Sequence, residues 1–478
     1  MKKHVAALWD QHQQECLKAQ KFIAELNLSA HPLSATISNL ADIGARFMAM
    51  SATDSANSHL PPSQDPHREK GAKNSNGKKP GGQHGRKGTR LLPFETPDKI
   101  IQLEVDPNQL TPDAKLVGLK KCQVVEIESK RLVIEYQSEI YRLADGSEVT
   151  ADFPDGVSAA IQYGQSVKAS VAYLSAFQLM PYARIGNLFS HQLHIPLSEG
   201  SIFNFLKETY ERLGPFEWWL KNKLSSAPLL HLDETGININ TKTHWIHTMA
   251  TSDLTLLLPH AKRGREAMNE FGVLPGYSGL VCHDCWSSYF AYDDATHVLC
   301  NAHIMRELKG AEEKYGCRWA KRMHALFKAM YKVCKDGGGS VPPDLRKKLR
   351  TRYRTILTLG EKECELAKDG GKQKRTKPQN LLIRLREHEE SVLRFLEDPA
   401  IPFTNNLAEN ALRMAKVQQK ISGCFRTMEG AKFFCRIRSY ISTCMKNGVS
   451  PAEALGVLFN GNLPDFIDCD AQPALAGE

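Results

Sequence analysis

Long apolar runs are missing from this 478-residue sequence, and no stretch approaches the roughly 20 residues that a membrane-spanning helix needs. The N-terminus reaches polar residues too soon for a signal peptide. The twelve cysteines are scattered and lack the dense spacing of a disulfide-stapled secreted domain. We therefore expect a cytoplasmic protein with reduced thiols and no membrane partner.

The charge balance is basic, with 62 Lys and Arg against 53 Asp and Glu, a formal net charge of +9. Such a balance favours a polyanionic partner but says nothing about the fold. The hydrophobic content of 42% is typical of a globular protein. A chain of this length exceeds one compact core, so we expect several domains.

The N-terminal part divides by composition. Residues 1–50 carry apolar residues at partly helical spacing, which predicts one or two helices that pair with a second copy or fold back on their own domain. Residues 51–94 are rich in Ser, Pro, Gly and the basic residues Lys and Arg. They have too few apolar groups to offset the entropy cost of ordering the segment. This segment is either a solvated linker or a DNA-backbone contact. The residues that would make the contact are Lys78, Lys79, Arg86, Lys87 and Arg90.

Two small modules follow. Residues 95–160 alternate apolar and polar side chains in three stretches, 99–105, 122–128 and 131–136, which predicts a small β module. Its only cysteine is Cys122, so it cannot build a four-ligand zinc site. Residues 161–215 show helical periodicity with a break capped by Ser198. A helix-turn-helix would direct Ser201, Asn204 and Lys207 toward a DNA groove, whereas plain three-helix packing would not.

Two acids follow apolar runs in the next region, residues 224–315. Leu229, Leu230 and Leu232 lead into Asp233, and a second run leads into Asp284. The predicted order is strand, strand, strand, helix, strand, helix, strand, helix, which is the order of an RNase H-like fold. There the first and fourth strands lie side by side, which would bring Asp233 and Asp284 together. Glu234, the neighbour of Asp233 on a strand, should point to the opposite face.

A third acid, Glu409, follows an Asn-rich segment that we interpret as a helix cap. We interpret residues 316–400 as an all-helical insertion, 401–450 as the core helices that carry Glu409, and 451–478 as a C-terminal tail. Glu409 could simply pair with Arg413 one helical turn away. The alternative is a metal ligand beside a basic phosphate track. The track would comprise Arg413, Lys416, Lys420 and Arg426.

Three carboxylates in a basic chain suit two-metal phosphodiester chemistry, in which two ions stabilise the attacking and leaving oxygens. Magnesium or manganese takes oxygen ligands, so Asp233, Asp284 and Glu409 would suffice as catalytic and metal-binding residues.

The cysteines offer a rival site. Cys282-x-x-Cys285 and Cys300-x-x-His303 have the spacing of a tetrahedral zinc site. Cys282 ends a predicted core strand, however, where cysteine usually acts as a small hydrophobe. A nucleophilic Cys300 with His303 as its base would lack an assignable oxyanion donor. We therefore favour two magnesium or manganese ions over zinc and leave Cys300 and His303 a structural role.

These motifs resemble one known family, the DDE transposases of IS66 insertion sequences. The resemblance rests on His231-Leu-Asp-Glu-Thr235, Asp284-x-Trp-x-x-Tyr289, Cys300-Asn-Ala-His303-x-x-Arg306 and Asn405-Asn-Leu-Ala-Glu409. Lys420-x-Ser-Gly-Cys-Phe-Arg-Thr and the linker pieces Leu60-Pro-Pro-Ser and Lys79-Pro-Gly-Gly-Gln reinforce it, and together they cover nearly the whole chain. The resemblance implies that Asp233, Asp284 and Glu409 are the catalytic triad.

The resemblance also implies a mechanism and partners. Hydrolysis at an element end would give a 3′-hydroxyl, which then attacks a target phosphodiester, without a covalent protein–DNA intermediate. The implied partners are the element's terminal repeats, target DNA, further copies of the chain on DNA at the nucleoid, and small accessory proteins. Family members commonly carry a paired-cysteine zinc module where this chain keeps only Cys122. The alternatives are a DNA-binding protein without catalysis and a nuclease that cuts without joining.

Overall fold

The computed structural model describes residues 91–109, 112–338, 341–364 and 375–468, which divide into two units. The larger unit contains 155–187 and 197 onward, and the smaller contains the described residues up to 154 together with 188–196. The predicted N-terminal helices, most of the basic linker and the last residues of the tail lie outside the described residues. The linker residues Lys78, Lys79, Arg86, Lys87 and Arg90 are therefore not described.

The smaller unit contains one antiparallel hairpin, formed by β1 (Ile140–Arg142) and β2 (Glu148–Thr150). Its turn uses Gly146 at a φ of 87°, and the Asp145 carboxylate accepts a hydrogen bond from Ser147 N–H at 2.9 Å, as a tight turn requires. A 3₁₀ turn, η1 (Pro107–Gln109), precedes the hairpin.

Within the described residues, strands of the predicted small β module are formed only in this hairpin. Residues 99–105, 122–128 and 131–136 form no strand, and none of the residues described between 91 and 154 is buried. Alternation predicts a strand only where a partner layer covers the apolar face. This segment has neither a core of its own nor paired cysteines for a metal, so nothing within it offsets the entropy of ordering.

The larger unit is built on a five-stranded mixed sheet, with the order β5-β4-β3-β6-β7. The first three strands form the predicted antiparallel meander, while β6 pairs parallel with both β3 and β7. Asn240 and Thr241 join β3 to β4 with φ of 45° and 67°, and a two-residue hairpin loop with two positive φ angles matches the twist of its strands. The strands are β3 (Leu229–Ile239), β4 (Lys242–Ala250), β5 (Thr255–His260), β6 (Leu280–His283) and β7 (Thr296–Leu299).

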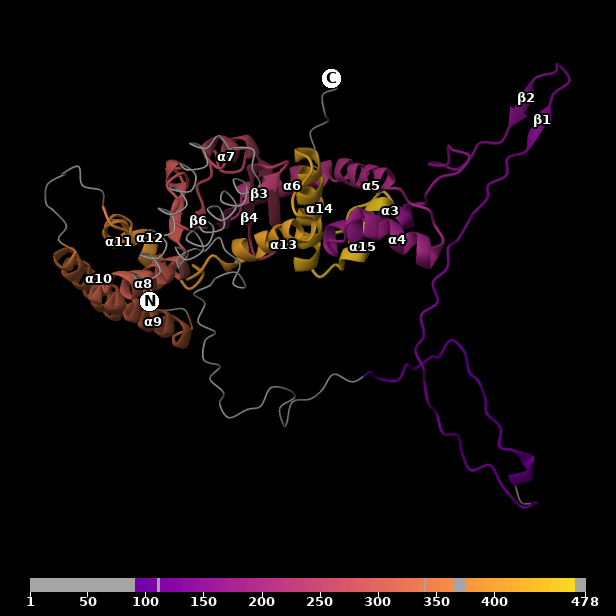
Figure 1. Ribbon diagram of the computed structural model, residues 1–478, viewed down its shortest axis with the longest axis horizontal. Coiled ribbons are helices and arrows are strands. Elements are labelled where there is room, and N and C mark those ends of the chain that lie inside the picture. The colour runs from indigo at the N-terminus through magenta and orange to yellow at the C-terminus, as the bar shows by residue number, and fades with distance from the viewer. Residues whose placement is uncertain (1–90, 110–111, 339–340, 365–374, 469–478) are drawn as a thin grey trace, which may run out of the picture. The chain divides into compact units, whose positions relative to one another are not determined.

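Helices cover this sheet, and Ser198 caps one of them as predicted, accepting a hydrogen bond from Ser201 N–H. Figure 1 shows α8 to α12 at one end of the sheet and α3, α5, α14 and α15 at the other. The helices before residue 300 are α3 (Gln165–Ala172), the π-helical turn η2 (Tyr173–Phe177), α4 (Tyr182–Leu193), α5 (Glu199–Arg212), α6 (Gly214–Ser225), α7 (Arg265–Phe271) and η3 (Tyr289–Ala291). The helices after residue 300 are α8 (Asn301–Tyr315), α9 (Arg318–Asp336), α10 (Pro343–Glu363), α11 (Lys377–Glu387), α12 (Glu389–Leu393), η4 (Arg394–Leu396), α13 (Asn406–Ser422), α14 (Met428–Lys446) and α15 (Pro451–Phe459).

Two helices fix the antiparallel half of the sheet. Leu412 of α13 packs in one buried cluster with Ile237 of β3 and Ile246 of β4. The α14 helix covers the edge strand β5, where the hydroxyls of Ser439 and Thr443 accept hydrogen bonds from the N–H groups of residues 257 and 255 at 2.8 and 3.1 Å. Because these donors have partners, the edge is closed to pairing with another strand.

The helices α8 to α12, here called the helical block, have their own core. In α9, Trp319, Met323, Phe327 and Met330 recur at helical spacing and are buried in this core. Each such side chain contributes about 1.5–3 kcal/mol when fully buried. A Cβ on Gly360 of α10 would come within 2.8 Å of the Trp319 ring, so only glycine allows this close approach. No helix in the described ranges is long and apolar enough to span a membrane.

Candidate active site

Two acids meet where β3 and β6 part. The parallel pairing places Leu229, Leu230 and His231 beside residues 280, 281 and 282. Continued by two residues, this register sets Asp284, just past the end of β6, beside Asp233. The sequence placed Asp233 at the end of its strand, but it lies in the middle of β3, which runs on to Ile239 because β4 still pairs with it. What ends near Asp233 is the pairing of β3 with β6, whereas β3 itself continues.

Asp233 is surrounded by negative charge. Burial raises the pKa of its carboxyl well above the ordinary value, and the nearby carboxylates of Glu234, Asp284 and Glu409 raise it further. The Glu234 backbone N–H donates to Asp233 Oδ1 at 2.9 Å. In the described chain no Lys or Arg forms an ion pair with Asp233. Asp233 is therefore under the electrostatic influence of both other sequence-predicted acids and has no compensating cation of its own.

Glu234 lies on the other face of β3, as strand alternation predicted. Its side chain is only 1% exposed, and its Oε1 accepts hydrogen bonds from Arg263 Nε and Nη2 at 2.8 and 2.6 Å. The Tyr289 hydroxyl donates to Oε2. The Arg263 guanidinium also lies 4.8 Å from the Trp245 ring centre and 4.3 Å from that of Trp286. This cluster pairs the buried charge of Glu234 and ties the loop after Asp284 to β3.

Asn405 joins the helix of the third acid to the strand of the first. It is fully buried, and its Nδ2 donates to the Leu232 carbonyl at 2.7 Å, which leaves its Oδ1 to accept from His231 Nδ1–H at 2.8 Å. The sequence suggested that this Asn-rich segment caps α13 with a side chain. Instead, Asn405 stands at the cap position without a side-chain cap bond, and its amide faces β3.

Glu409 lies one turn into α13, where a helix N-terminus favours a carboxylate. Its Oε1 is 3.4 Å from Arg306 Nη2 and 3.5 Å from His303 Nδ1, both on α8. Its ionic partner is thus Arg306 and not Arg413, which is exposed. Burial and the nearby Arg306 lower the pKa of His303 below its usual value, so this imidazole is neutral near pH 7.

The four-ligand zinc set suggested by the cysteine spacing is not assembled. Among the residues that the structure describes, the group of metal-ligand side chains whose atoms all lie within 4.8 Å of one another is Cys300, His303 and Glu409. Cys282 is fully buried near Cys300, and Cys285 lies near the charges of the helical block. The structure thus contains a possible Cys/His/Glu site in place of a Cys₃His site.

A family comparison bears on this arrangement. The sequence model described as Transposase IS66 family matches residues 160–433, a range that contains all three acids. The chain belongs to the IS66 transposase family. A further relative is an uncharacterized protein, y4jO, of Sinorhizobium fredii, which is 28% identical over 163 residues. That match covers 34% of this chain and 47% of y4jO, so the chain spans about half the length of the curated relative it matches.

The basic residues predicted to contact DNA occupy different environments in this IS66-family chain. Arg413, Lys420 and Arg426 are exposed, but Lys416 is half-buried and donates to the Gly236 carbonyl, which holds α13 against β3. Burial lowers the pKa of Lys416. Only three of the four side chains on this segment are thus free to face a phosphate backbone.

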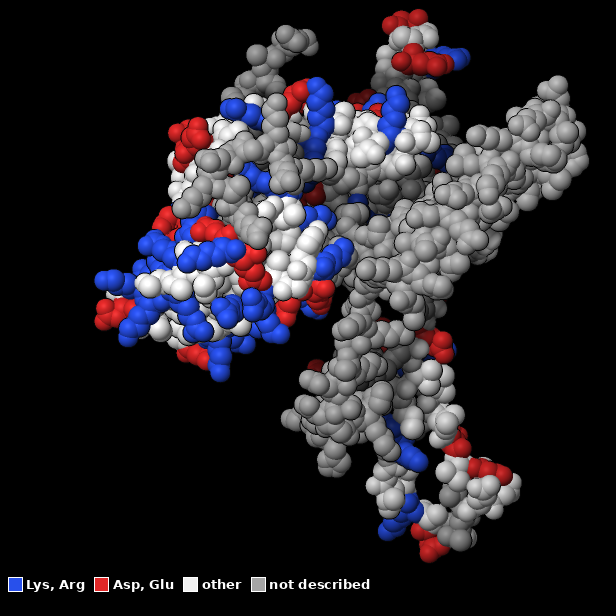
Figure 2. Space-filling view, turned by 60° about the vertical axis from the view of Figure 1, so that its left-hand side comes forward, with Lys and Arg blue, Asp and Glu red and all other residues white. Residues whose placement is uncertain are grey.

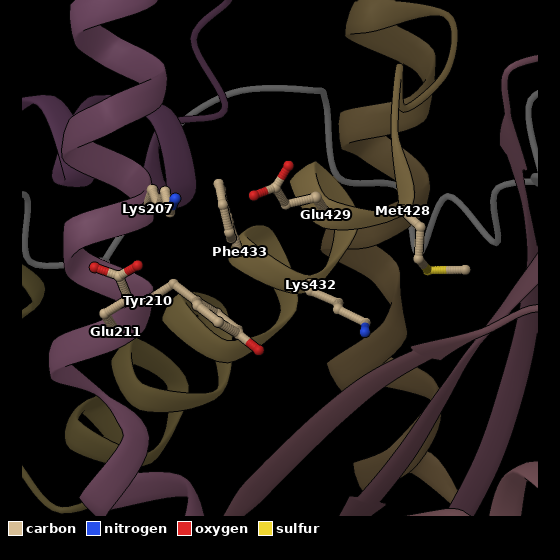
Figure 3. A pocket seen from close by; sticks show the side chains of 7 residues that line it. All are labelled: Lys207, Tyr210, Glu211, Met428, Glu429, Lys432 and Phe433. Carbon is tan, nitrogen blue, oxygen red and sulfur yellow. The ribbon is translucent and has the colours of Figure 1, made fainter. Parts of the chain in front are cut away.

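The predicted helix-turn-helix residues on α5 also differ. Asn204 is exposed, whereas the Ser201 hydroxyl pairs with Ser198 Oγ at 2.9 Å. Lys207 lines a hollow of about 280 Å³ between α5 and the start of α14 (Figure 3). Both Lys and Glu line this hollow, so its charge is mixed. The other lining residues are Tyr210, Glu211, Met428, Glu429, Lys432 and Phe433.

Sequence reasoning gave no role to Arg263 and took Asn405 for a helix cap. Arg263 carried no signal, because its partner Glu234 lies 29 residues away and meets it only through the sheet. The motif around Asp284 did contain Tyr289 at a fixed spacing, but spacing alone does not reveal a bond to Glu234. These residues position the acids without belonging to the predicted triad.

Proposed function

We propose that this IS66-family chain is a DDE transposase that binds the ends of its element at the nucleoid. In this proposal it catalyses metal-dependent DNA cleavage and strand transfer with Asp233, Asp284 and Glu409. The observation that carries the proposal is the convergence of three carboxylates from β3, the loop after β6 and α13 around Asp233, which is partly buried and has a raised pKa. A carboxyl group whose pKa is raised by burial and by neighbouring acids is typical of functional sites.

The donor set fits divalent magnesium or manganese. Asp233 is partly buried among like charges without a cation, whereas the more deeply buried Glu234 has Arg263. Carboxylate oxygens are the ligands that these hard ions prefer. We therefore assign the ions to Asp233, Asp284 and Glu409. When bound, they stabilise the charge that develops on the attacking and leaving oxygens of a phosphodiester.

Other side chains act around the acids. Asn405 fixes the start of α13, the helix that carries Glu409, to β3, and the Arg263 cluster holds the loop that carries Asp284. The Arg306 side chain, 41% exposed and beside Glu409, is placed to contact a DNA phosphate. Positioning of this kind supplies much of the rate in phosphodiester transfer, because the reacting groups must be aligned.

The strand order supports an RNase H-like core in this proposal. Three antiparallel strands, then a parallel pair on the side of β3, follow the order that we expected for that fold. Its first strand carries Asp233, its fourth precedes Asp284, and the helical block stands between the second acid and the third. We propose that residues 316–400, the part of this block that follows α8, are an insertion and that the domain boundaries follow the divisions expected from the sequence.

The helical block offers a second surface for DNA. The α9 helix carries six Lys or Arg against one acid, and α10 carries seven against three. Figure 2 shows blue side chains crowded over this part of the molecule. Residues of α10 also line a shallow hollow of about 650 Å³. We call this surface the α9–α10 face. Its exposed bases, including Lys347, Lys348 and Arg352, would follow a phosphate backbone without reading sequence.

The reaction itself can be tested with purified full-length protein, Mg²⁺ and a labelled duplex that carries the DNA flanking the coding region. The proposal predicts cut product and product joined to target DNA. Cut product alone would indicate a nuclease, and a shifted band without cutting would indicate a DNA-binding protein; both results contradict the proposal. Cross-linking the same mixture tests whether the chain acts as an oligomer, and adding the element's accessory proteins tests their part.

A further inference from the structure

The first turn of α8 contains two side chains that the proposed reaction does not use. Cys300 stands at the N-cap position and His303 lies three residues on, so both face the same side. Glu409 of α13 approaches them, and the Sγ, imidazole nitrogen and carboxylate oxygen lie within 4.8 Å of one another. Three ligand atoms of different chemistry therefore meet between two helices.

The thiol is surrounded by hydrogen-bond donors. Cys300 is buried, and the Asn405 backbone N–H donates to its Sγ at 3.2 Å. The backbone N–H groups of Ala302 and His303 also favour the thiolate, although burial raises the pKa of the thiol overall. Donors aimed at a sulfur stabilise its charged form, which is the form that binds metal.

The imidazole has a buried nitrogen without a hydrogen-bond partner. His303 Nδ1 faces Glu409 Oε1 at 3.5 Å, a separation too long for a hydrogen bond, and it contacts no other acceptor or donor in the described chain. A buried polar atom that lacks a partner needs an explanation.

We propose that Cys300, His303 and Glu409 form a binding site for a thiophilic divalent cation of the zinc class. Thiolate and imidazole select such a cation over magnesium, and three protein ligands leave a fourth position open. Ligands of a tetrahedral zinc ion lie roughly 3.5 Å apart. The three ligand atoms lie within 4.8 Å of one another, so they have to approach by no more than roughly 1.3 Å. The half-exposed Arg306 would swing away from Glu409 as the cation enters.

The site shares Glu409 with the acid cluster, so it would regulate catalysis. A cation held by Cys300 and His303 draws the Glu409 carboxylate toward α8 and away from Asp233. Zinc would then inhibit magnesium-dependent cleavage. This consequence rests on the proposed function, whereas the site itself does not.

Binding can be measured without DNA, with Co²⁺ as the probe. Titration of the purified full-length protein should produce the thiolate-to-cobalt charge-transfer absorption, and Zn²⁺ should abolish it. Cys300→Ser, which keeps a hydrogen-bond acceptor for Asn405, should lose this absorption. His303→Gln should weaken Co²⁺ binding at least tenfold, on the order of the loss seen when metal-site partners are removed. The matched control is Cys334→Ser on α9, which should leave the spectrum unchanged.

Three results would overturn the site: no absorption in the parent, full absorption in Cys300→Ser, or equal binding by His303→Gln. Far-ultraviolet circular dichroism of each variant shows whether it is folded. If Cys300→Ser does not fold, Co²⁺ binding by His303→Gln tests the site in its place. Inhibition is then measured as the Zn²⁺ concentration that halves cleavage, which should rise at least about tenfold in Cys300→Ser. Failure to cut with Mg²⁺ alone would count against the proposed function, while a missing cobalt spectrum would count against this site.

Discussion

Asn405→Ala should both destabilise the protein and slow its reaction. The side chain is fully buried and makes two hydrogen bonds across 173 and 174 residues of sequence, from its Nδ2 to the Leu232 carbonyl and from His231 Nδ1 to its Oδ1. Alanine removes both partners and leaves one buried donor and one buried acceptor unpaired. Each such group costs about 1–3 kcal/mol, so the free energy of unfolding should fall by about 2–6 kcal/mol.

The same change should displace Glu409. The α13 helix begins at the residue after Asn405, and without the amide nothing polar fixes its first turn to β3. A shift of about 1 Å at a reacting group can cost roughly 100-fold in rate, so we expect Mg²⁺-dependent cleavage to fall by about that factor. If the cleavage rate falls by more than the folded fraction of the variant does, then Asn405 positions Glu409 in addition to stabilising the fold.

The assay is urea unfolding followed by tryptophan fluorescence, with cleavage measured on the same preparations. The matched control is Asn406→Ala, which alters the exposed neighbouring asparagine and should change the free energy of unfolding by less than about 0.5 kcal/mol. A loss below about 1 kcal/mol for Asn405→Ala, or cleavage at the parent rate, would refute the reasoning.

Three further predictions concern charge. Arg263→Met leaves Glu234 buried and unpaired, so urea unfolding should show a loss of about 3–5 kcal/mol, much of it regained when Glu234→Gln is added. In EDTA the raised pKa of Asp233 means that the folded state holds this proton more tightly than the unfolded state does. Thermal stability should therefore rise as the pH falls through that raised pKa toward the ordinary carboxyl value. Asp233→Asn should raise the unfolding temperature at a pH above the raised pKa and flatten the pH dependence. Neutralising three bases of the α9–α10 face should reduce the slope of log binding constant against log salt by about 0.9 for each phosphate that the protein no longer neutralises, and an unchanged slope would exclude that face.

The sheet was predictable because its signals are local. Apolar runs that lead into Asp233 and Asp284, the turn at Asn240 and the period-two pattern of β4 identify the strands, and the pattern of elements implied that β3 and β6 pair. The helix that carries Glu409 also followed from its periodicity. These local signals, taken with the strand arrangement of an RNase H-like fold, predicted that β3 and β6 lie side by side.

What failed depended on contacts between distant segments. Alternation between 99 and 136 has the pattern of strands, but a strand needs a covering layer that this segment does not contain. Asn405 is of a residue type that commonly caps helices. Its buried amide instead forms hydrogen bonds with a carbonyl and an imidazole of β3, because these buried groups would otherwise be unpaired. Lys416 has the sequence context of a surface base and is held by the Gly236 carbonyl. In each case the partner, and not the residue type, determines the role.

The most direct test of the triad compares single variants for Mg²⁺-dependent cleavage of a labelled element end. Asp233→Asn, Asp284→Asn and Glu409→Gln should each bind the DNA as the parent does and yield no cut product. Asp294→Asn, an exposed acid ten residues after Asp284, should cut at the parent rate. Cleavage at the parent rate by any of the three triad variants would contradict the account.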